Sequence, residues 1–327
     1  VAAIANPATK IVSLTITEAG YKFSPRTGGL DLDQAQVRAD LAGGDPVTAV
    51  GQVARGLLKR AEHGTPLAVL SCDNMNSNGH LMRRLLTEFA AALPSAETEV
   101  LTKYLDLAVS FPNAMVDRIV PATDDRVRAM AAQRLGAIDA IPVAAEPFSM
   151  WVMEDDFAGG RPAWERHGAI FSDEVPAYET LKLRYLNGSH SLIVYLGALA
   201  GCRTIPDARF TPWIEREIRA LLAEYEPTFT LPAAIEGPAY IEQLMGRWSN
   251  TVLGDLCSRV GTDGSTKLPQ RITEPVLFYA ERGQVPQRLA LLVAAWLACL
   301  APLGGFDPGP FAADMQDPAR PVLIPQA

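Results

Sequence analysis

One long run, from Asp173 to Gly201, constrains the fold of this chain more than any other stretch. Its apolar side chains recur every three or four residues, which is the spacing of one face of a helix. The side chains in this pattern are Leu181, Leu183, Leu186, Leu192, Ile193, Leu196 and Leu199. The run therefore predicts a single long helix.

Among the polar residues of this run, three are predicted to project from one side of the helix: Lys182, Asn187 and His190. An α-helix advances about 100° per residue, so relative to Lys182 the imidazole lies at about 80° and the amide at about 140°. Gly188 lowers helix stability by about 1 kcal/mol relative to Ala, but it lets another group approach the backbone closely. Each polar residue alone also fits an ordinary solvated or core position. Together they indicate a functional site.

Composition and charge exclude several classes of protein. The 327 residues suffice for one large or two ordinary domains, and 48% hydrophobic content predicts a substantial core. A net charge of -8 without a dense Lys/Arg run argues against a nucleic-acid partner. The apolar stretch Leu289–Leu300 is too short to span a bilayer, so we expect no membrane contact.

The cysteines are scattered singly along the chain, which argues against a disulfide framework or a zinc cluster. They are Cys72, Cys202, Cys257 and Cys299. We therefore expect reduced thiols, a cytoplasmic protein and no metal.

The first half of the chain alternates strand and helix patterns. Lys10–Thr17 predicts a strand, Pro46–His63 a helix, and Leu67–Ser71 a buried parallel strand. The polar loop Cys72–His80 follows, and Leu81–Leu93 predicts a further helix. Ligands of open α/β sheets bind outside the carboxyl ends of the strands, where this loop lies.

Two further extended segments, Ser110–Thr123 and Ile138–Phe157, precede a change to helical patterns. The later helices are predicted at Pro238–Val260 and Pro286–Leu300, with a basic-tipped loop at Gly261–Arg271 between them. The predicted fold class is α/β. A partial Rossmann-like parallel-sheet domain occupies residues 1–171, and an all-α substrate and catalytic domain occupies residues 172–327.

Four blocks, SLTITEAGY, SCDNMNSNG, FPNAMVDRIVP and KLRYLNGSH, resemble the polyol-specific long-chain dehydrogenases. This family includes mannitol 2-dehydrogenase and fructuronate reductase (D-mannonate oxidoreductase). GTDGSTKLPQR is a plausible fifth block, and together the blocks cover most of the chain in the family's order. The resemblance implies a nicotinamide-dependent, metal-independent oxidoreductase acting on the CH–OH group of a small sugar acid or polyol.

The resemblance also implies roles for individual residues. The catalytic set falls on Lys182, Asn187, His190 and Asn78. The substrate-binding set falls on Asp117, Arg259 and Lys267, and Glu18 resembles a carboxylate on a proton route. Asp73 and Asn74, in the loop after the second strand, are the candidates for cofactor binding.

These residue types suit the oxidation of an alcohol to a ketone. A lysine in an apolar site has its pKa lowered and serves as general base, or as acid in the reverse direction. Two Asn amides donating to one oxygen stabilise the developing negative charge by about 3 kcal/mol each, by analogy with oxyanion holes. Arg271 or Arg259 offers a bidentate partner to the carboxylate of a hexuronate.

The sequence departs from the family in two respects. No strand followed by a Gly-rich turn, the motif that cradles a dinucleotide pyrophosphate, is found. The chain also stops before the family's closing helices, so we interpret it as the middle and most of the C-terminal part of a longer protein. We expect NAD as cofactor. NADP remains open, because the ribose-reading residue follows the Gly-rich turn.

The substrate admits alternatives. The segments DGSTKLPQR and KLRYLNGSHS favour fructuronate reductase, and mannitol 2-dehydrogenase is the second candidate. A 6-phosphogluconate-type dehydrogenase ranks behind both, since there a His precedes the Asn. A non-catalytic sugar-binding remnant that lost its cofactor half is a third possibility. The sequence does not indicate an oligomeric state.

Overall fold

The computed structural model describes residues 1–24 and 26–324. Pro25, in the predicted first domain, and residues 325–327, in the predicted second, lie outside the described residues. The chain forms two compact units. The first unit comprises Val1–Asp117 and Ser149–Pro176, and the second comprises Arg118–Phe148 and the chain from Ala177 onward.

The first unit contains a parallel sheet of three strands. Its order is β1 (Ile11–Leu14), β4 (Leu67–Ser71) and β5 (Val109–Ser110), and both pairings are parallel. All five residues of β4 are buried, as its continuous apolar run predicts. Leu67 and Val69 belong to one hydrophobic core and Leu70 to another, so both faces of this strand are covered. The predicted Rossmann-like sheet is therefore confirmed.

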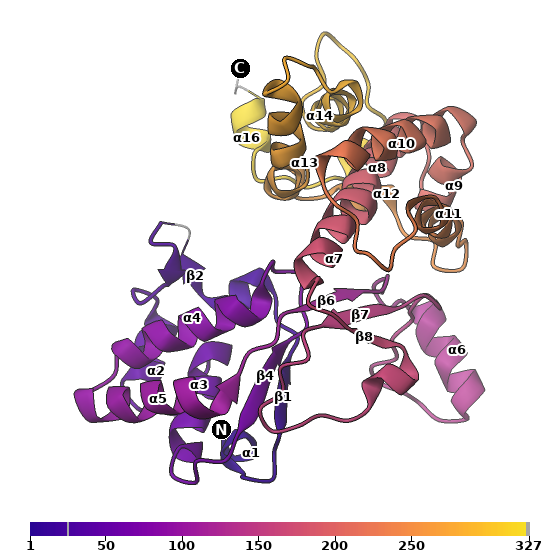
Figure 1. The fold of residues 1–327 in the computed structure, drawn as a ribbon. Coiled ribbons are helices and arrows are strands. Elements are labelled where there is room, and N and C mark those ends of the chain that lie inside the picture. Colours follow the sequence, from indigo (N-terminus) through magenta and orange to yellow (C-terminus); the bar gives the residue numbers. More distant parts are fainter. Residues whose placement is uncertain (25, 325–327) are drawn as a thin grey trace. The chain divides into compact units, whose positions relative to one another are not determined.

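Three helices pack against this sheet (Figure 1). They are α3 (Ala49–Arg60), α4 (Asn78–Ala91) and α5 (Ser95–Ala108). The shorter helices of this unit are α1 (Ala2–Ala5), α2 (Ala35–Leu41) and the 3-10 turns Glu18–Tyr21 and Trp164–His167. The Thr48 hydroxyl caps α3 by accepting from the Gly51 amide at 2.9 Å. Helix α4 begins at Asn78, three residues before the predicted start, so Asn78 is helical.

A second, mixed sheet completes the first unit. β6 (Ala114–Asp117) pairs antiparallel with β7 (Met150–Met153), which pairs parallel with β8 (Ala169–Phe171). A short hairpin joins β2 (Phe23–Ser24) to β3 (Gly29–Leu30). The extended segments predicted before residue 157 therefore form β6 and β7.

The second unit is helical, and α8 (Ser189–Leu199) lies at its centre with almost every residue buried (Figure 1). The helices in contact with α8 are α9 (Ile205–Arg209), α10 (Pro212–Tyr225), α12 (Cys257–Gly261), α14 (Gln287–Leu300) and α15 (Pro310–Ala313). The remaining elements are α6 (Asp125–Leu135), α11 (Gly237–Trp248), α13 (Gly264–Ala280), α16 (Arg320–Leu323) and a 3-10 turn at Glu226–Thr228. The α/β fold followed by a helical domain is thus confirmed.

The predicted single helix from Asp173 to Gly201 is present without a break from Val175 to Leu199, but its hydrogen-bond register is not α throughout. The chain forms α7 (Val175–Leu181), then a π-helical turn over Lys182–Gly188, then α8. A π turn carries the same apolar side chains as an α-helix, so the apolar spacing alone did not distinguish them. The angles calculated for Lys182, Asn187 and His190 therefore need correction.

Two predictions after residue 237 are also wrong. The helix predicted at Pro238–Val260 is two helices, α11 and α12, because the Asn250 side chain accepts from the Val252 amide at 3.1 Å and turns the chain there. The segment predicted as a loop at Gly261–Arg271 enters α13 at Gly264. There the buried Leu268 and the bond from the Ser265 amide to Asp317 (2.9 Å) favour the helix over its turn-forming residues.

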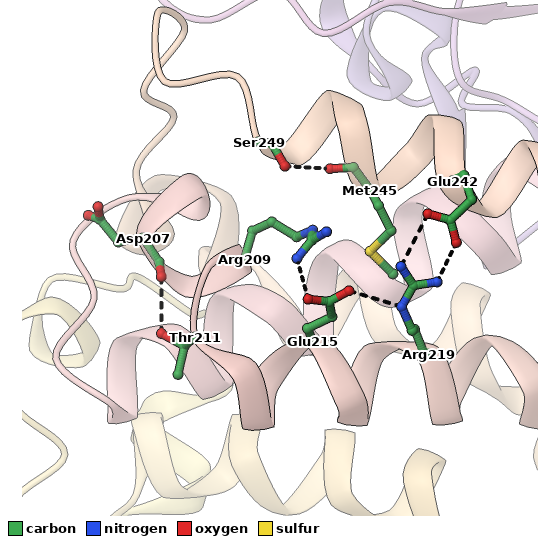
Figure 2. Close-up of polar contacts among 8 residues, drawn as sticks. All are labelled: Asp207, Arg209, Thr211, Glu215, Arg219, Glu242, Met245 and Ser249. Carbon is green, nitrogen blue, oxygen red and sulfur yellow. Dashed lines mark hydrogen bonds and ion pairs between the residues drawn. The ribbon is translucent and has the colours of Figure 1, made fainter.

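An ionic network joins three helices of the second unit (Figure 2). Arg209 of α9 contacts Glu215 of α10 at 2.7 Å, and Arg219 links Glu215 at 3.0 Å to Glu242 of α11 at 2.6 Å. Isolated surface pairs contribute little, but a network fixes several side chains at once. In the described residues, no helix combines the length and the apolar character needed to cross a bilayer.

Gly79, at the start of α4, tests the packing of the first unit. A Cβ there would lie 2.6 Å from the Pro112 carbonyl oxygen and closer still to that of Phe111, and both are backbone atoms. We expect Gly79→Ala to lower the free energy of unfolding by about 3 kcal/mol. Gly246, exposed in α11 with no neighbour near its Cβ position, is the matched control. Gly246→Ala should stabilise by about 0.5–1 kcal/mol in the same urea titration. Equal effects of the two would contradict the packing described.

Candidate functional site

The π-helical turn Lys182–Gly188 carries two of the predicted catalytic residues, Lys182 and Asn187. Each backbone amide in such a turn bonds five residues back instead of four, so each turn takes in more residues. Side chains five positions apart therefore lie closer to one face than the 140° predicted for an α-helix. Both side chains are half-buried. π turns are rare and frequently mark functional sites.

Residues from two other helices contact this turn. Arg271 of α13 donates from Nη1 to the Asn187 carbonyl at 2.9 Å and to Ser191 Oγ at 2.5 Å. Tyr225 of α10 packs against Gly188, where a Cβ would lie 2.8 Å from Tyr225 Cζ. The close approach predicted for Gly188 is therefore confirmed, and the approaching group is this tyrosine.

His190, in the first turn of α8, is half-buried and stacks on Trp248 of α11, with ring centroids 6.2 Å apart. Its Nε2 atom is shielded from solvent and has no hydrogen-bond partner among the described residues. Burial, followed by the positive charges of Arg271 and Arg247, lowers the pKa of His190 to about 3. The imidazole is therefore neutral near pH 7.

A small cavity of about 20 Å³ lies beside His190 within the second unit. Its lining includes Ile119, Arg247, Trp248 and Asp255. This volume holds about one water molecule. The buried Nε2 of His190 thus borders a space where a single small polar group fits.

The predicted substrate-binding cations lie near His190, since Arg259 and Lys267 also depress its pKa. Arg259 donates from Nε to Asp255 Oδ1 at 2.8 Å, and its Nη2 donates to Oδ2 of the same carboxylate. Lys267 donates to the Thr262 carbonyl at 2.6 Å. Burial, followed by the charge of Arg271, lowers the pKa of Lys267. Asp263 and Asp317 act on this pKa in the opposite direction, so cations and carboxylates are interspersed in this part of the second unit.

One buried ion pair near His190 was not predicted from the sequence. Arg247 of α11 contacts Glu146 at 2.8 Å, and both side chains are almost fully buried. Glu146 also accepts from the Ile119 amide at 2.6 Å, and Arg247 lies 4.0 Å from the centre of the Phe148 ring. The two charged residues are about a hundred positions apart, so no spacing in the sequence relates them.

In the first unit, the loop after β4 is anchored through Asp73. This buried carboxylate accepts from the Tyr21 hydroxyl and, at 3.0 Å, from the Met75 amide. Burial and the neighbouring Asp73 both raise the pKa of Tyr21. Tyr21 ends the 3-10 turn that begins at the exposed Glu18, so Glu18 and this loop belong to one local structure. Asn74, next in the loop, is exposed.

Asn78 is fully buried at the start of α4. Its side-chain nitrogen donates to the Ala114 carbonyl at 2.8 Å, and its oxygen accepts from the Ala114 amide at 3.0 Å. The amide thus pairs with β6 as another strand would. Asp117, the buried last residue of β6, lies three positions further along that strand. Ser77, just before Asn78, has a φ of 49°, an uncommon conformation for a residue other than glycine.

The predicted site residues divide between the two units. The first unit holds Glu18, Asp73, Asn74, Asn78 and Asp117, and the second holds Lys182, Asn187, His190, Arg259, Lys267 and Arg271. Within the second unit, the π turn, His190 and the cations of α12 and α13 come together. Among the described residues, no group of three or more His, Cys, Asp or Glu side chains is arranged to hold a metal ion.

The fold and these residues define a two-domain protein of the Rossmann class whose helical domain carries a Lys-x4-Asn-x2-His set on a π turn and the start of α8. Family models agree: the mannitol dehydrogenase Rossmann domain matches residues 1–166, and the mannitol dehydrogenase C-terminal domain matches residues 174–319. The chain belongs to the mannitol dehydrogenase family.

Individual relatives support the same assignment. The chain is 39% identical over 319 residues to D-mannonate oxidoreductase of Escherichia coli (strain K12), which covers 97% of this chain and 64% of the relative. It is 39% identical over 302 residues to mannitol 2-dehydrogenase of Pyrenophora tritici-repentis, covering 90% of this chain and 53% of the relative. The chain therefore spans less than two thirds of each relative's length.

A solved structure is similar over almost the whole chain. It is Pseudomonas fluorescens mannitol 2-dehydrogenase in ternary complex with NAD and D-mannitol, with a TM-score of 0.80 and 36% identity. The match covers 98% of this chain and 64% of that one.

The low pKa of His190 makes stability depend on pH. The unfolded chain binds a proton at His190 as the pH falls through about 6.5, whereas the folded protein does so only near pH 3. This contribution is therefore present above pH 6.5 and is lost as the pH falls. Between pH 7.5 and 5.0 the loss in the free energy of unfolding amounts to about 2 kcal/mol.

We expect His190→Asn to remove this slope in urea titrations at several pH values. His167→Asn, at an exposed histidine of the first unit, should retain it. A His190→Asn variant with the parent's pH slope would contradict the neutral, buried imidazole.

Proposed function

We propose that the protein of which this chain is part is a nicotinamide-dependent oxidoreductase that interconverts a secondary alcohol and a ketone on a sugar acid or polyol. Fructuronate reductase is the activity we favour. The observation that carries the proposal is the π turn with Lys182 and Asn187, close in sequence to a neutral His190, in a chain of the mannitol dehydrogenase family.

The cofactor proposal rests on the loop after β4. Parallel strands β1 and β4 end at the same edge of the sheet, which is where such folds bind nucleotides. The exposed Asn74 fits a role in holding a nicotinamide dinucleotide, whereas the buried Asp73 fits a role in fixing the loop through Tyr21 and Met75. When bound, the nicotinamide supplies or accepts the hydride. The NAD complex of a relative favours NAD over NADP.

We assign proton transfer to Lys182. In oxidation, its neutral amine accepts the proton of the substrate hydroxyl, and in reduction its ammonium returns a proton to the carbonyl oxygen. The exposed Glu18 is our candidate for passing protons to solvent. A positioned acid or base of this kind contributes about 10²–10⁴-fold to the rate.

Two amides are our candidates for stabilising the oxyanion. The Asn187 side chain projects from the π turn that carries Lys182, and an Asn amide nitrogen carries two hydrogens, of which Ala114 takes one at Asn78. We propose that the second hydrogen of Asn78 and the Asn187 amide donate to the reacting oxygen, worth about 3 kcal/mol each. A neutral His190 orients a neighbouring hydroxyl, because neutral imidazole both donates and accepts.

The cations of α12 and α13 are our reason for favouring an acidic substrate. The positive charges of Arg259, Lys267 and Arg271 all lower the pKa of His190. A hexuronate carries a carboxylate that can pair with such cations, and a polyol lacks one. We propose that Arg259 and Lys267 face this carboxylate and that Asp117 binds substrate hydroxyls. Mannitol 2-dehydrogenase remains the second candidate, since relatives with that name are as similar as the D-mannonate oxidoreductase.

Substitution of Lys182 tests the mechanism. Lys182→Ala in the intact protein should lower kcat by about 10²–10⁴-fold, because the proton of the hydroxyl has no acceptor. Binding of NADH, followed by its fluorescence, should change by less than about threefold, since the amine acts on the substrate oxygen. Lys103→Ala, at an exposed position of α5, should leave both values unchanged. Unchanged turnover in Lys182→Ala would exclude Lys182 as the base.

The substrate proposal is tested by comparing two ketones. We expect the intact protein to reduce D-fructuronate with NADH about tenfold or more faster, in kcat/KM, than D-fructose, because only the former pairs with the cations. The opposite ranking would assign mannitol 2-dehydrogenase activity. Absence of turnover with every hexuronate and polyol would favour the non-catalytic sugar-binding remnant.

A further inference from the structure

We propose that Arg271 is a positioning residue that fixes the π-helical turn and, through it, the direction of Asn187. The inference rests on the proposed function, in which Asn187 donates to the reacting oxygen. It differs from the role predicted from the sequence, in which Arg271 binds the carboxylate of the substrate.

The place where Arg271 meets the turn is the reason for this assignment. The hydrogen-bond register changes from π to α at Gly188–Ser189, immediately after Asn187. The Asn187 carbonyl lies at this junction and accepts from Arg271 Nη1 at 2.9 Å and from Ser191 Oγ at 3.3 Å. Arg271 thus bonds directly to the backbone of the residue whose side chain is proposed to donate to the reacting oxygen.

Nη1 of Arg271 has no capacity left for a substrate. This nitrogen carries two hydrogens, and its two acceptors, the Asn187 carbonyl and Ser191 Oγ, take both. A fork-like grip on a carboxylate through both terminal nitrogens therefore requires that a bond to the turn be broken.

Tyr225 supports the same arrangement from α10. Its hydroxyl donates to the Arg271 carbonyl at 3.3 Å, and its ring lies against Gly188. Tyr225 is fully buried, so its position is set by the core. One side chain therefore contacts both the arginine and the turn, and the two helices α10 and α13 hold the turn together.

The kinetic test uses Arg271→Met, Arg271→Lys and two substrates, D-fructuronate and D-fructose, with the intact protein. We expect Arg271→Met to lower kcat by about 10²-fold on both substrates, because a small misplacement of a catalytic group has this effect, with KM within about threefold. Arg271→Lys keeps a donor and should recover part of the loss. A rise in KM for D-fructuronate alone, with kcat preserved, would overturn the proposal in favour of carboxylate binding.

A second test of the proposal uses crystal structures and does not depend on activity. The crystal structure of Arg271→Met, or of Arg271→Lys if the Met variant does not fold, should lose the π hydrogen bonding over 182–188. Arg216→Met, at an exposed arginine of α10, should retain it. An unchanged π turn in the Arg271 variant would overturn the proposal. If the parent protein has no turnover, the proposed function fails. The crystallographic comparison still decides whether Arg271 fixes the π turn.

Discussion

The second unit depends on one backbone irregularity, the π turn between α7 and α8. Such a turn is less favourable than the α-helix it replaces, so other parts of the structure must stabilise it. Three features do so here: the missing side chain of Gly188, the ring of Tyr225 against it, and the two bonds from Arg271 Nη1. Because they come from three different helical segments, the turn is built into the packing of the unit.

Cations and carboxylates are interspersed around this turn, and carboxylates pair with several of the cations. Glu146 pairs with Arg247 in the interior, and Asp255 grips Arg259 at a half-exposed position. Removing one partner of a buried pair leaves an uncompensated charge, so Glu146 and Arg247 must be present together. These pairs fix the guanidinium groups whose fields act on His190.

The sequence predicted the elements that obey regular periods, and it missed those that depend on distant contacts. The buried strand Leu67–Ser71 and the helix before it follow directly from apolar spacing. The π turn has the same spacing as an α-helix, and the loop predicted at Gly261–Arg271 is helical because Asp317 and the burial of Leu268 outweigh local turn signals. The pairing of Asn78 with Ala114 and of Glu146 with Arg247 joins residues far apart in sequence, which no local pattern encodes.

In the mechanism we propose, burial and these charges also bear on which group in the second unit exchanges protons. A histidine near a reacting hydroxyl would normally compete for its proton, since its ordinary pKa is near 6.5. Burial and surrounding cations depress the pKa of His190 to about 3, so its neutral ring is too weak a base to take that role at neutral pH. In the mechanism we propose, His190 is left to orient a hydroxyl by hydrogen bonding, and the proton passes to the lysine of the π turn.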